Sequence, residues 1–145
     1  DVCSSDLVMY RFEKALYDDP HQDINALWWD LVEKYQLVKK PPNRDEPDWA
    51  AKIHIATYPC YYHNYLLGHL LAAQLNAYIV RNVLHGTDFQ TPDYVQKPEI
   101  GKYLVGHLYD YGARYPWSGV IEKATGEALT PAYYAEFTLG VPAAR

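Results

Sequence analysis

Polar side chains crowd the start of an otherwise apolar stretch, KIHIATYPCYYHNYLLGHLLAAQ, at residues 52–74. Lys52, His54 and the tyrosines that follow them can bind anionic groups or donate hydrogen bonds to carbonyl oxygens. Such groups avoid an apolar helix unless a partner or a ligand satisfies them. We therefore expect a charged or hydrated ligand to lie against this segment.

The aromatic residues after Pro59 follow helical spacing. With about 100° of rotation per residue, Tyr62, Tyr65 and His69 fall on one stripe of a helix. The same stripe continues through Ala72 and Asn76. Because the stripe is polar at its N-terminal end, we expect it to line a cavity.

Each of these residues also has an ordinary structural explanation. Buried tyrosines often only anchor their hydroxyls on backbone carbonyls, and His54, in a segment expected to be extended, has the alternative role of a core histidine. His63 and His69 lie about 240° apart around a helix and cannot share a metal ion without other ligands. No HExxH, GxSxG or glycine-rich phosphate loop occurs. The residues themselves thus give no metal ligands in this chain and no complete catalytic set.

Composition limits the classes of protein that fit. The chain has 145 residues, of which 49% are hydrophobic and 21% charged, as expected of one domain or part of one. A net charge of -5 without a long basic run argues against a nucleic-acid partner. The longest apolar stretch, residues 65–80, contains three polar residues and is a poor membrane span. Cys3 and Cys60 lack the spacing of a zinc knuckle or a disulfide framework.

The pattern predicts an all-α chain. A proline-rich surface connector is expected at residues 39–49. Residues 66–80 are apolar nearly all the way round their helix, which is typical of a helix buried on every side. Helices are expected at residues 8–17, at 24–38 with Asp23 as N-cap, from about Pro59 to His85-Gly86, at roughly 99–113, from Pro116 to TGE, and after Thr130 with Pro131 as first helical residue.

The second of these helices has a clear apolar face. Its apolar positions are Ile24, Leu27, Trp28, Leu31, Val32 and Tyr35. The N-terminal DVCSSDL, residues 1–7, looks like translated adapter sequence rather than native protein. We therefore expect the native sequence to begin near Val8.

Five blocks in a fixed order resemble one protein family. The blocks are NALWWDLVEKYQ, a proline-rich connector, AKIHI, YPCYYHNYLLG, and IGKYL followed by GARYPWSGVIEKATGEALTP. From about Tyr10 to its end, the chain is similar to the C-terminal part of the angiotensin-converting-enzyme family of zinc peptidyl-dipeptidases. The resemblance implies an all-helical protein with two lobes around a deep channel, and residues 8–145 would be a C-terminal helical part of its catalytic domain.

The resemblance also implies roles for single residues. Lys52 would bind the terminal carboxylate of the substrate, and His54 would bond the peptide backbone beside the scissile bond. If one inserted residue is allowed, Tyr62 joins Lys52 on the carboxylate and Tyr65 donates to the oxyanion. An alternative register places Tyr61 where Tyr62 is expected.

The chain departs from the family pattern at several positions. His69 stands where an aromatic pocket residue is expected and would alter which side chain is accepted near the C-terminus of the substrate. The HExxH helix and the glutamate ligand would lie upstream of residue 1, so zinc is expected only in the full-length parent. The chloride-binding arginines of the animal enzymes correspond to Val32 and Asn64, and no chloride is expected.

We therefore expect the substrate-binding and transition-state-stabilising part of a zinc-dependent peptidyl-dipeptidase, which removes dipeptides from peptide C-termini. The chain alone is expected to be inactive. Its partners would be peptide substrates, with no nucleic acid and no membrane span. Two alternatives remain, a related endo-acting oligopeptidase and a non-enzymatic helical interaction module.

Overall fold

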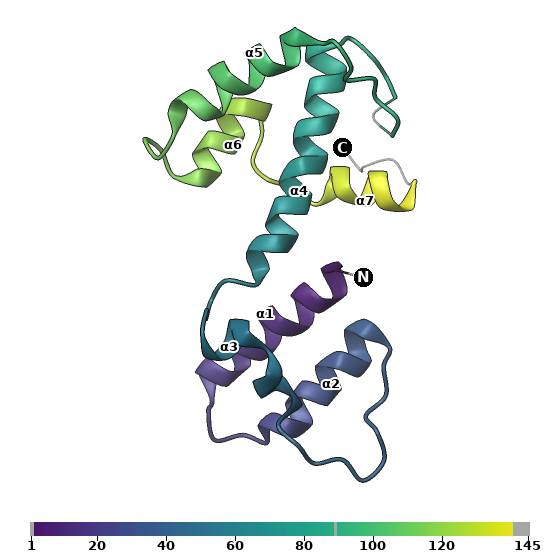
Figure 1. Cartoon of the computed structure of the whole chain (residues 1–145), viewed down its shortest axis with the longest axis vertical. Coiled ribbons are helices and arrows are strands. Elements are labelled where there is room, and N and C mark those ends of the chain that lie inside the picture. The colour runs from purple at the N-terminus through teal and green to yellow at the C-terminus, as the bar shows by residue number, and fades with distance from the viewer. Residues whose placement is uncertain (1, 89, 141–145) are drawn as a thin grey trace. The chain divides into compact units, whose positions relative to one another are not determined.

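The computed structural model describes residues 2–88 and 90–140, and the regular elements in these ranges are all helical (Figure 1). The all-α class predicted from the sequence is confirmed. The chain divides into two compact units, residues 1–67 and 68–145. Each unit has a hydrophobic core of its own.

The described α-helices are α1 (Val2–Asp18), α2 (Ile24–Gln36), α3 (Ile53–Ala56), α4 (His63–Tyr78), α5 (Pro98–His107), α6 (Trp117–Thr125) and α7 (Ala132–Leu139). The boundary between the units falls within α4. Shorter turns are the 3₁₀-helical η1 (Asp48–Ala51) and η3 (Tyr109–Tyr111) and the π-helical η2 (Ile79–Val83).

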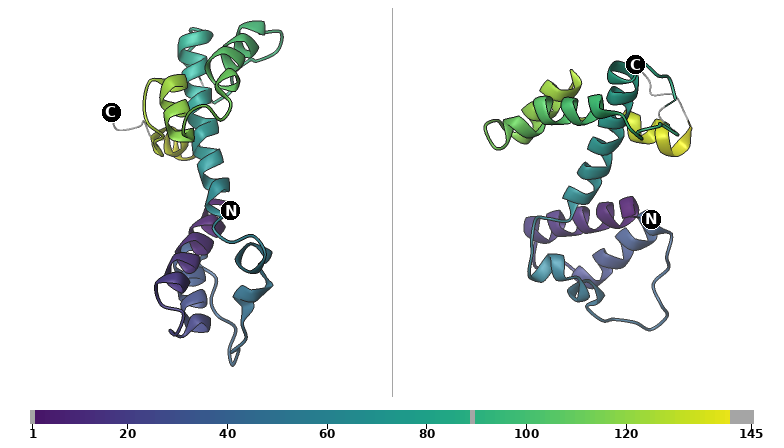
Figure 2. Two further views of the ribbon diagram at one scale, coloured as in Figure 1. Left: turned by 90° about the vertical axis from the view of Figure 1, so that its left-hand side faces the viewer. Right: turned by 45° about the horizontal axis from the view of Figure 1, so that its top comes forward.

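The core of the first unit lies between α1 and α2, which pack side by side (Figure 2). Phe12 is fully buried and meets the ring of Trp28 edge-on, with 5.3 Å between centroids. Trp49 packs against the same phenyl ring at 5.7 Å. The apolar face predicted for α2 is confirmed, because its members enter or line this core: Ile24, Leu27, Trp28, Leu31, Val32 and Tyr35.

Helix α1 is longer than predicted. We expected residues 8–17, whereas the helix spans Val2–Asp18. No glycine or proline occurs before Pro20, so nothing in the sequence stops the helix from extending toward its N-terminus. Within this extension Asp6 is only 1% exposed. The expectation that residues 1–7 are adapter-like stays a prediction.

Local capping fixes both ends of α2. As predicted, Asp23 is the N-cap, and its Oδ1 accepts a hydrogen bond from the backbone N–H of Ala26 at 2.9 Å. At the other end Leu37 is left-handed, with φ of 58°, and its N–H donates to the carbonyl of Glu33. The connector at residues 39–49 contains no α-helix, also as predicted.

His54 lies on the single helical turn α3, so the prediction of an extended segment there is wrong. Only Lys52, which precedes the turn, has extended backbone angles (φ −88°, ψ 107°). Trp49 and Ile55 both pack against the core of the first unit. The chain between them must therefore turn tightly, and a helical turn does so while satisfying backbone hydrogen bonds.

Helix α4 begins at His63, four residues after the predicted start at Pro59. Cys60 has a left-handed backbone, with φ of 58°. Its N–H donates to Oε1 of the buried Glu13 on α1 at 2.5 Å. A left-handed residue interrupts a right-handed helix, so α4 can begin only after this turn.

The end of the long helix is as predicted, but its last turn is unusual. After Tyr78 the helix continues as the π turn η2, in which the N–H of Leu84 donates to the carbonyl of Ile79 at 3.0 Å. His85 is left-handed, with φ of 55°, and Gly86 follows it. The helix therefore stops at the His85-Gly86 pair.

In the second unit, α5 and α6 lie on one side of the C-terminal part of α4, and α7 lies on the other (Figure 1). Helix α5 ends at His107, six residues before its predicted end, and η3 follows. As the TGE motif predicts, α6 ends at Thr125 with a left-handed Gly126 (φ 79°). Helix α7 begins at Ala132 with Pro131 as its N-cap, so the predicted N-cap at Thr130 and start at Pro131 are each one residue early.

The prediction that the long helix is buried on every side is wrong for the part in the second unit. Ala73, Gln74 and Ala77 are buried there, whereas His69 and Ala72 are exposed. The neighbouring helices cover only part of the circumference, and the open face borders a pocket. In the described ranges, none of the helices is long and apolar enough to cross a membrane.

Candidate active site

Three tyrosine rings surround the imidazole of His54 in the first unit. The centroid of Tyr62 lies 4.7 Å from that of His54, with the rings edge to face. Tyr65 lies at 5.9 Å in a similar geometry, and Tyr61 lies at 6.2 Å with its ring nearly parallel to the imidazole. Tyr65 also contacts the other two rings, at 5.7 and 5.3 Å. We call these four residues the tyrosine cluster.

Tyr62 attaches the tyrosine cluster to the core of the first unit. Its ring is half-buried and packs against the hydrophobic residues of α1 and α2. This burial raises the pKa of the Tyr62 hydroxyl, and the negative charge of the buried Asp6 and then Tyr65 raise it further. A tyrosine hydroxyl is protonated at neutral pH even without this shift, so Tyr62 is able to donate a hydrogen bond.

Tyr65 is the more accessible member, with 44% of its surface exposed. It lies on the first turn of α4, where its backbone N–H donates to the carbonyl of Tyr62 at 3.2 Å. Its hydroxyl is 3.5 Å from Nε2 of His54, at the long end of hydrogen-bonding range. Long contacts of this kind are common between catalytic groups before substrate binds. The hydroxyl is therefore placed to donate to a group that enters from solvent.

A small pocket of about 350 Å³ opens beside His54. Its walls are Ile53, His54, Tyr58 and Tyr61, whereas Tyr62 is not among them. No role is predicted for Tyr58 from the sequence, and Tyr61 is predicted only as an alternative to Tyr62. The left-handed turn at Cys60 sets the direction in which these side chains leave the chain, and no sequence motif predicts that turn.

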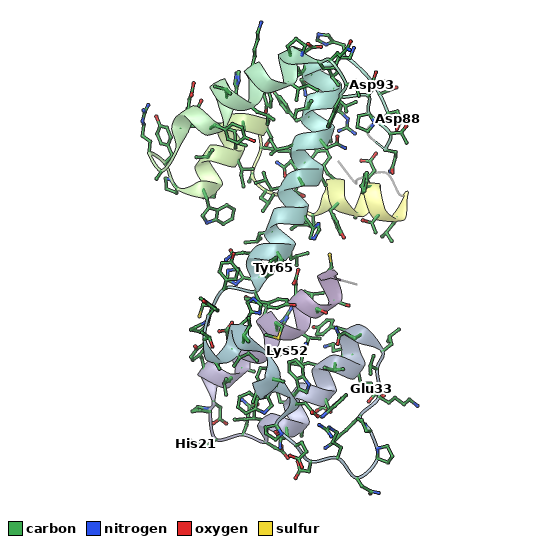
Figure 3. All side chains as sticks on the ribbon, in the orientation of Figure 1. His21, Glu33, Lys52, Tyr65, Asp88 and Asp93 are labelled. Atoms are coloured by element: carbon green, nitrogen blue, oxygen red, sulfur yellow. The ribbon has the colours of Figure 1, made fainter. Side chains whose placement is uncertain are left out.

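Lys52 lies on the segment that enters α3, and Tyr65 lies on the first turn of α4 (Figure 3). The lysine is exposed, and within the described residues no hydrogen bond or ion pair joins its ammonium group to another side chain. No polar bond therefore joins Lys52 to the tyrosine cluster in the described residues. Its charge is available to an anion from outside the chain.

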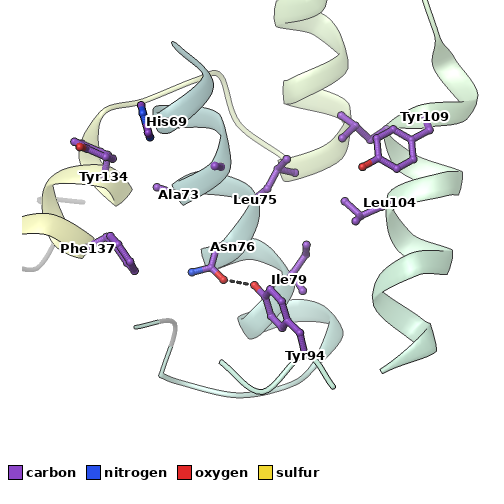
Figure 4. A pocket seen from close by; sticks show the side chains of 12 residues that line it. His69, Ala73, Leu75, Asn76, Ile79, Tyr94, Leu104, Tyr109, Tyr134 and Phe137 are labelled. Atoms are coloured by element: carbon purple, nitrogen blue, oxygen red, sulfur yellow. Dashed lines mark hydrogen bonds between the residues drawn. The ribbon is translucent and has the colours of Figure 1, made fainter. Parts of the chain in front are cut away.

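His69 belongs to the second unit and lines a different pocket, of about 480 Å³ (Figure 4). The imidazole lies 6.1 Å from the ring of Tyr134 on α7. Across the pocket the hydroxyl of Tyr94 donates to Oδ1 of Asn76. The predicted helical stripe accounts for part of the wall, because Ala72 and Asn76 line the pocket together with His69.

The described side chains do not form a metal site. Nowhere in residues 2–88 and 90–140 do three or more His, Cys, Asp or Glu side chains gather in a way that could hold a metal ion. The ring of His63 instead lies edge-on against Tyr10 on α1, with 6.1 Å between centroids. The donor set of this part of the chain thus does not fit a zinc ion.

Comparison with known families gives a clear match. A family model described as angiotensin-converting enzyme matches residues 7–133, which is most of the chain. The chain belongs to the angiotensin-converting-enzyme family. The matched region contains every member of the tyrosine cluster, as well as Lys52 and His69.

Two relatives show how much of a family member the chain represents. It is 34% identical over 123 residues to the angiotensin-converting enzyme-like protein Ace3 of Mus musculus, and 28% identical over 119 residues to the angiotensin-converting enzyme of Theromyzon tessulatum. Each alignment covers 81% of the chain but only 16% and 19% of the relative. The chain thus spans less than a fifth of the length of these angiotensin-converting-enzyme relatives. No solved structure matches it significantly.

Proposed function

We propose that this chain supplies the substrate-binding and transition-state-stabilising side chains of a zinc-dependent peptidyl-dipeptidase, which releases dipeptides from peptide C-termini. Family membership supports a relation to peptidases. The observation that carries the proposal is the tyrosine cluster, in which His54 and the accessible hydroxyl of Tyr65 lie 3.5 Å apart.

Tyr65 is the proposed catalytic donor. When water adds to a peptide carbonyl, negative charge develops on the carbonyl oxygen, and a fixed hydroxyl donor stabilises that oxyanion. Tyr65 is held by ring contacts to His54, Tyr61 and Tyr62, which limit the directions that its hydroxyl can take. His54 is the proposed partner of the peptide backbone, because an imidazole can donate from one nitrogen and accept at the other.

Lys52 and Tyr62 are the proposed anchor for the substrate's terminal carboxylate. The exposed ammonium of Lys52 has no intramolecular ion pair to give up within the described residues. The hydroxyl of Tyr62 is protonated at neutral pH, as a tyrosine hydroxyl ordinarily is, and a hydroxyl donor complements the ammonium on a carboxylate. Tyr61 is the alternative partner, supported by its place in the wall of the pocket beside His54.

His69 is proposed to contact the substrate's side chain near its C-terminus. Support comes from its position in the wall of the pocket of the second unit, beside Tyr134. The pocket is lined mostly by apolar and aromatic side chains, a lining that favours an apolar substrate group.

Zinc would come with residues outside the described part of the chain, which does not supply a metal site. When bound in the parent, zinc would supply Lewis-acid chemistry. Chloride is not expected, because Val32 is buried in the apolar core of α1 and α2, and Asn64 carries no charge. An uncompensated anion would lose its hydration at such places without a countercharge.

A related endo-acting oligopeptidase is the second candidate. In such an enzyme Lys52 would not hold a terminal carboxylate. The observation that favours it is that no hydrogen bond joins Lys52 to the tyrosine cluster in the described chain.

The proposal is tested in a zinc-loaded chimera, in which residues 7–140, the matched region together with the whole of α7, replace the corresponding segment of the Theromyzon tessulatum enzyme. We expect dipeptide release from free-acid peptides, and a loss in kcat of roughly 10²-fold or more for Tyr65→Phe, with little change in KM. Tyr10→Phe is the matched control, because Tyr10 contacts His63 outside the tyrosine cluster. A raised KM with normal kcat for Tyr65→Phe would contradict the catalytic role.

A further inference from the structure

Gln74 is a buried polar side chain of the second unit, and its hydrogen bonds go to the segment that leads from α6 to α7. Gln74 lies on α4 among apolar residues and is only 1% exposed. Its Nε2 donates to Oγ1 of Thr125 at 2.8 Å and to the carbonyls of Glu127 and Ala128 at 3.3 Å. Its Oε1 accepts from the N–H of Thr130 at 3.0 Å. Gln74 thus binds both ends of residues 125–130, which run from the last residue of α6 into the connection to α7.

Helix α7 meets the rest of the second unit through partly buried and exposed side chains. None of its residues is buried. On one side Tyr133 packs against the small core formed by Ala77 and Val80. Glu136 adds a loose ion pair with Arg81, at 3.8 Å. Nε2 of Gln90 also donates to the carbonyls of Glu136 and Phe137, in exposed bonds of 3.4 and 3.3 Å. Exposed contacts of this kind hold a helix less firmly than a buried network of hydrogen bonds.

The position of α7 decides the shape of the pocket that contains His69. Tyr134 and Phe137 project from α7 and form part of the wall, and His69 on α4 lies next to Tyr134 (Figure 4). The contact between His69 and Tyr134 exists only if α7 lies where the connection places it.

We infer that Gln74 is a positioning residue, which holds α7 so that Tyr134 closes the pocket around His69. It does not touch the substrate and acts through the connection at residues 125–130. The part of this inference that concerns substrate rests on the proposed function, in which His69 contacts a side chain of the peptide.

The structural part is tested by NMR of the whole 145-residue chain with ¹³C-labelled histidine. Tyr134→Ala defines the His69 ring signal when the ring contact is absent. Gln74→Met keeps the size of the side chain but removes its hydrogen bonds, and we expect it to move the His69 signal to the Tyr134→Ala position. Asn82→Ala is the control, because Asn82 is exposed and bonds only the carbonyl of Tyr78.

A second variant distinguishes a loss of positioning from unfolding of the unit. Thr125→Val leaves Gln74 in place but removes one of its partners, so the His69 signal should move part of the way. An unchanged signal in Gln74→Met would overturn the inference. So would an equal loss of the signal from His107, which stacks on Tyr103 in the other core of the unit, because Gln74 would then be a general core residue.

The substrate part is tested in the zinc-loaded chimera. We expect Gln74→Met to raise KM about tenfold with kcat unchanged, as when binding weakens by one lost hydrogen bond. A fall in kcat with an unchanged KM would contradict the inference. If the unmodified chimera releases no dipeptide, the proposed function fails, while the NMR result still decides whether Gln74 positions α7.

Discussion

Each unit pairs a histidine with a tyrosine, but the two pairs use their polar atoms differently. In the first unit His54 meets Tyr62 at 4.7 Å, and in the second His107 stacks on Tyr103 at 4.9 Å. The Tyr103 hydroxyl donates to the backbone carbonyl of Ala124, and Nδ1 of His107 lies 3.1 Å from the carbonyl of Tyr103. The second pair is therefore bonded to the backbone.

Burial separates the two pairs further. Desolvation raises the pKa of Tyr103 to about 12, and the residue is 8% exposed. In the tyrosine cluster, Tyr65 is 44% exposed and its hydroxyl lies nearest the side chain of His54. In the second unit the polar atoms of His107 and Tyr103 lie against backbone carbonyls, so this pair serves packing. In the tyrosine cluster the hydroxyl of the exposed Tyr65 is open to a partner from solvent, an arrangement that suits chemistry.

The largest expected effect concerns the core under the tyrosine cluster. Phe12→Ala should destabilise the first unit by about 3–5 kcal/mol, because it removes a fully buried ring. Three of the four tryptophans, Trp28, Trp29 and Trp49, lie in the first unit, so their fluorescence during urea unfolding reports the loss. Amide exchange in the second unit should stay unchanged. Equal loss of protection in both units would show that they do not fold separately.

The next effect distinguishes the proposed anchor from the catalytic donor. In the zinc-loaded chimera, Lys52→Ala should weaken free-acid substrates by about 1.5–3 kcal/mol, as for a lost charged hydrogen bond, and should barely affect C-terminally amidated ones. Lys39→Ala, in the connector, is the matched control. Comparable losses on both kinds of substrate would favour the endo-acting candidate.

The same pair of substrates decides the tyrosine register. If Tyr62 is the partner of Lys52, Tyr62→Phe should reduce the preference for free-acid peptides by about 0.5–1.5 kcal/mol, the usual contribution of one hydrogen bond. Tyr61→Phe should leave that preference unchanged. The opposite result would assign the anchor to Tyr61.

A smaller effect tests the structural pair of the second unit. Tyr103→Phe should lower the free energy of unfolding by about 1 kcal/mol, because the hydrogen bond to Ala124 is lost, and peptidase activity of the chimera should not change. Thermal unfolding and initial rates measure the two properties. A loss of activity without a loss of stability would give Tyr103 a role that its burial does not predict.

The last prediction is that chloride has no effect on peptidase activity. Val32 and Asn64 offer no positive charge, so exchanging chloride for acetate at constant ionic strength should leave peptidase activity flat, provided that the chimera retains no chloride site elsewhere. Asn64→Arg is the companion variant, which adds a positive charge at one of these positions. A several-fold chloride activation of the chimera would mean that another cation near these positions holds the anion.

Helices marked by local signals were predictable from the sequence. Asp23 begins α2 and Gly126 ends α6 as expected, because capping depends on a few neighbouring residues. The turn α3 was not predictable in this way. It forms because Trp49 and Ile55 are drawn into the same core, and packing between distant residues leaves no local pattern.

The candidate site was predictable in its residue types and less so in its geometry. Helical spacing placed Tyr62 and Tyr65 together, and both meet His54 in the structure. The pocket wall formed by Tyr58 and Tyr61 depends on the left-handed Cys60, whose N–H is held by Glu13 some 47 residues earlier. The roles of these residues stay predictions.

The π turn at Ile79–Val83 acts as a one-residue insertion that the helix absorbs without a loop. A helical wheel drawn through it loses phase, because residues after the turn are rotated by about a quarter of a circle relative to those before. Deleting one residue there would restore regular winding and swing Leu84 off its contacts with α5. Gaps placed within residues 79–83 when family members are aligned therefore mark changes of helical phase rather than changes of loop length.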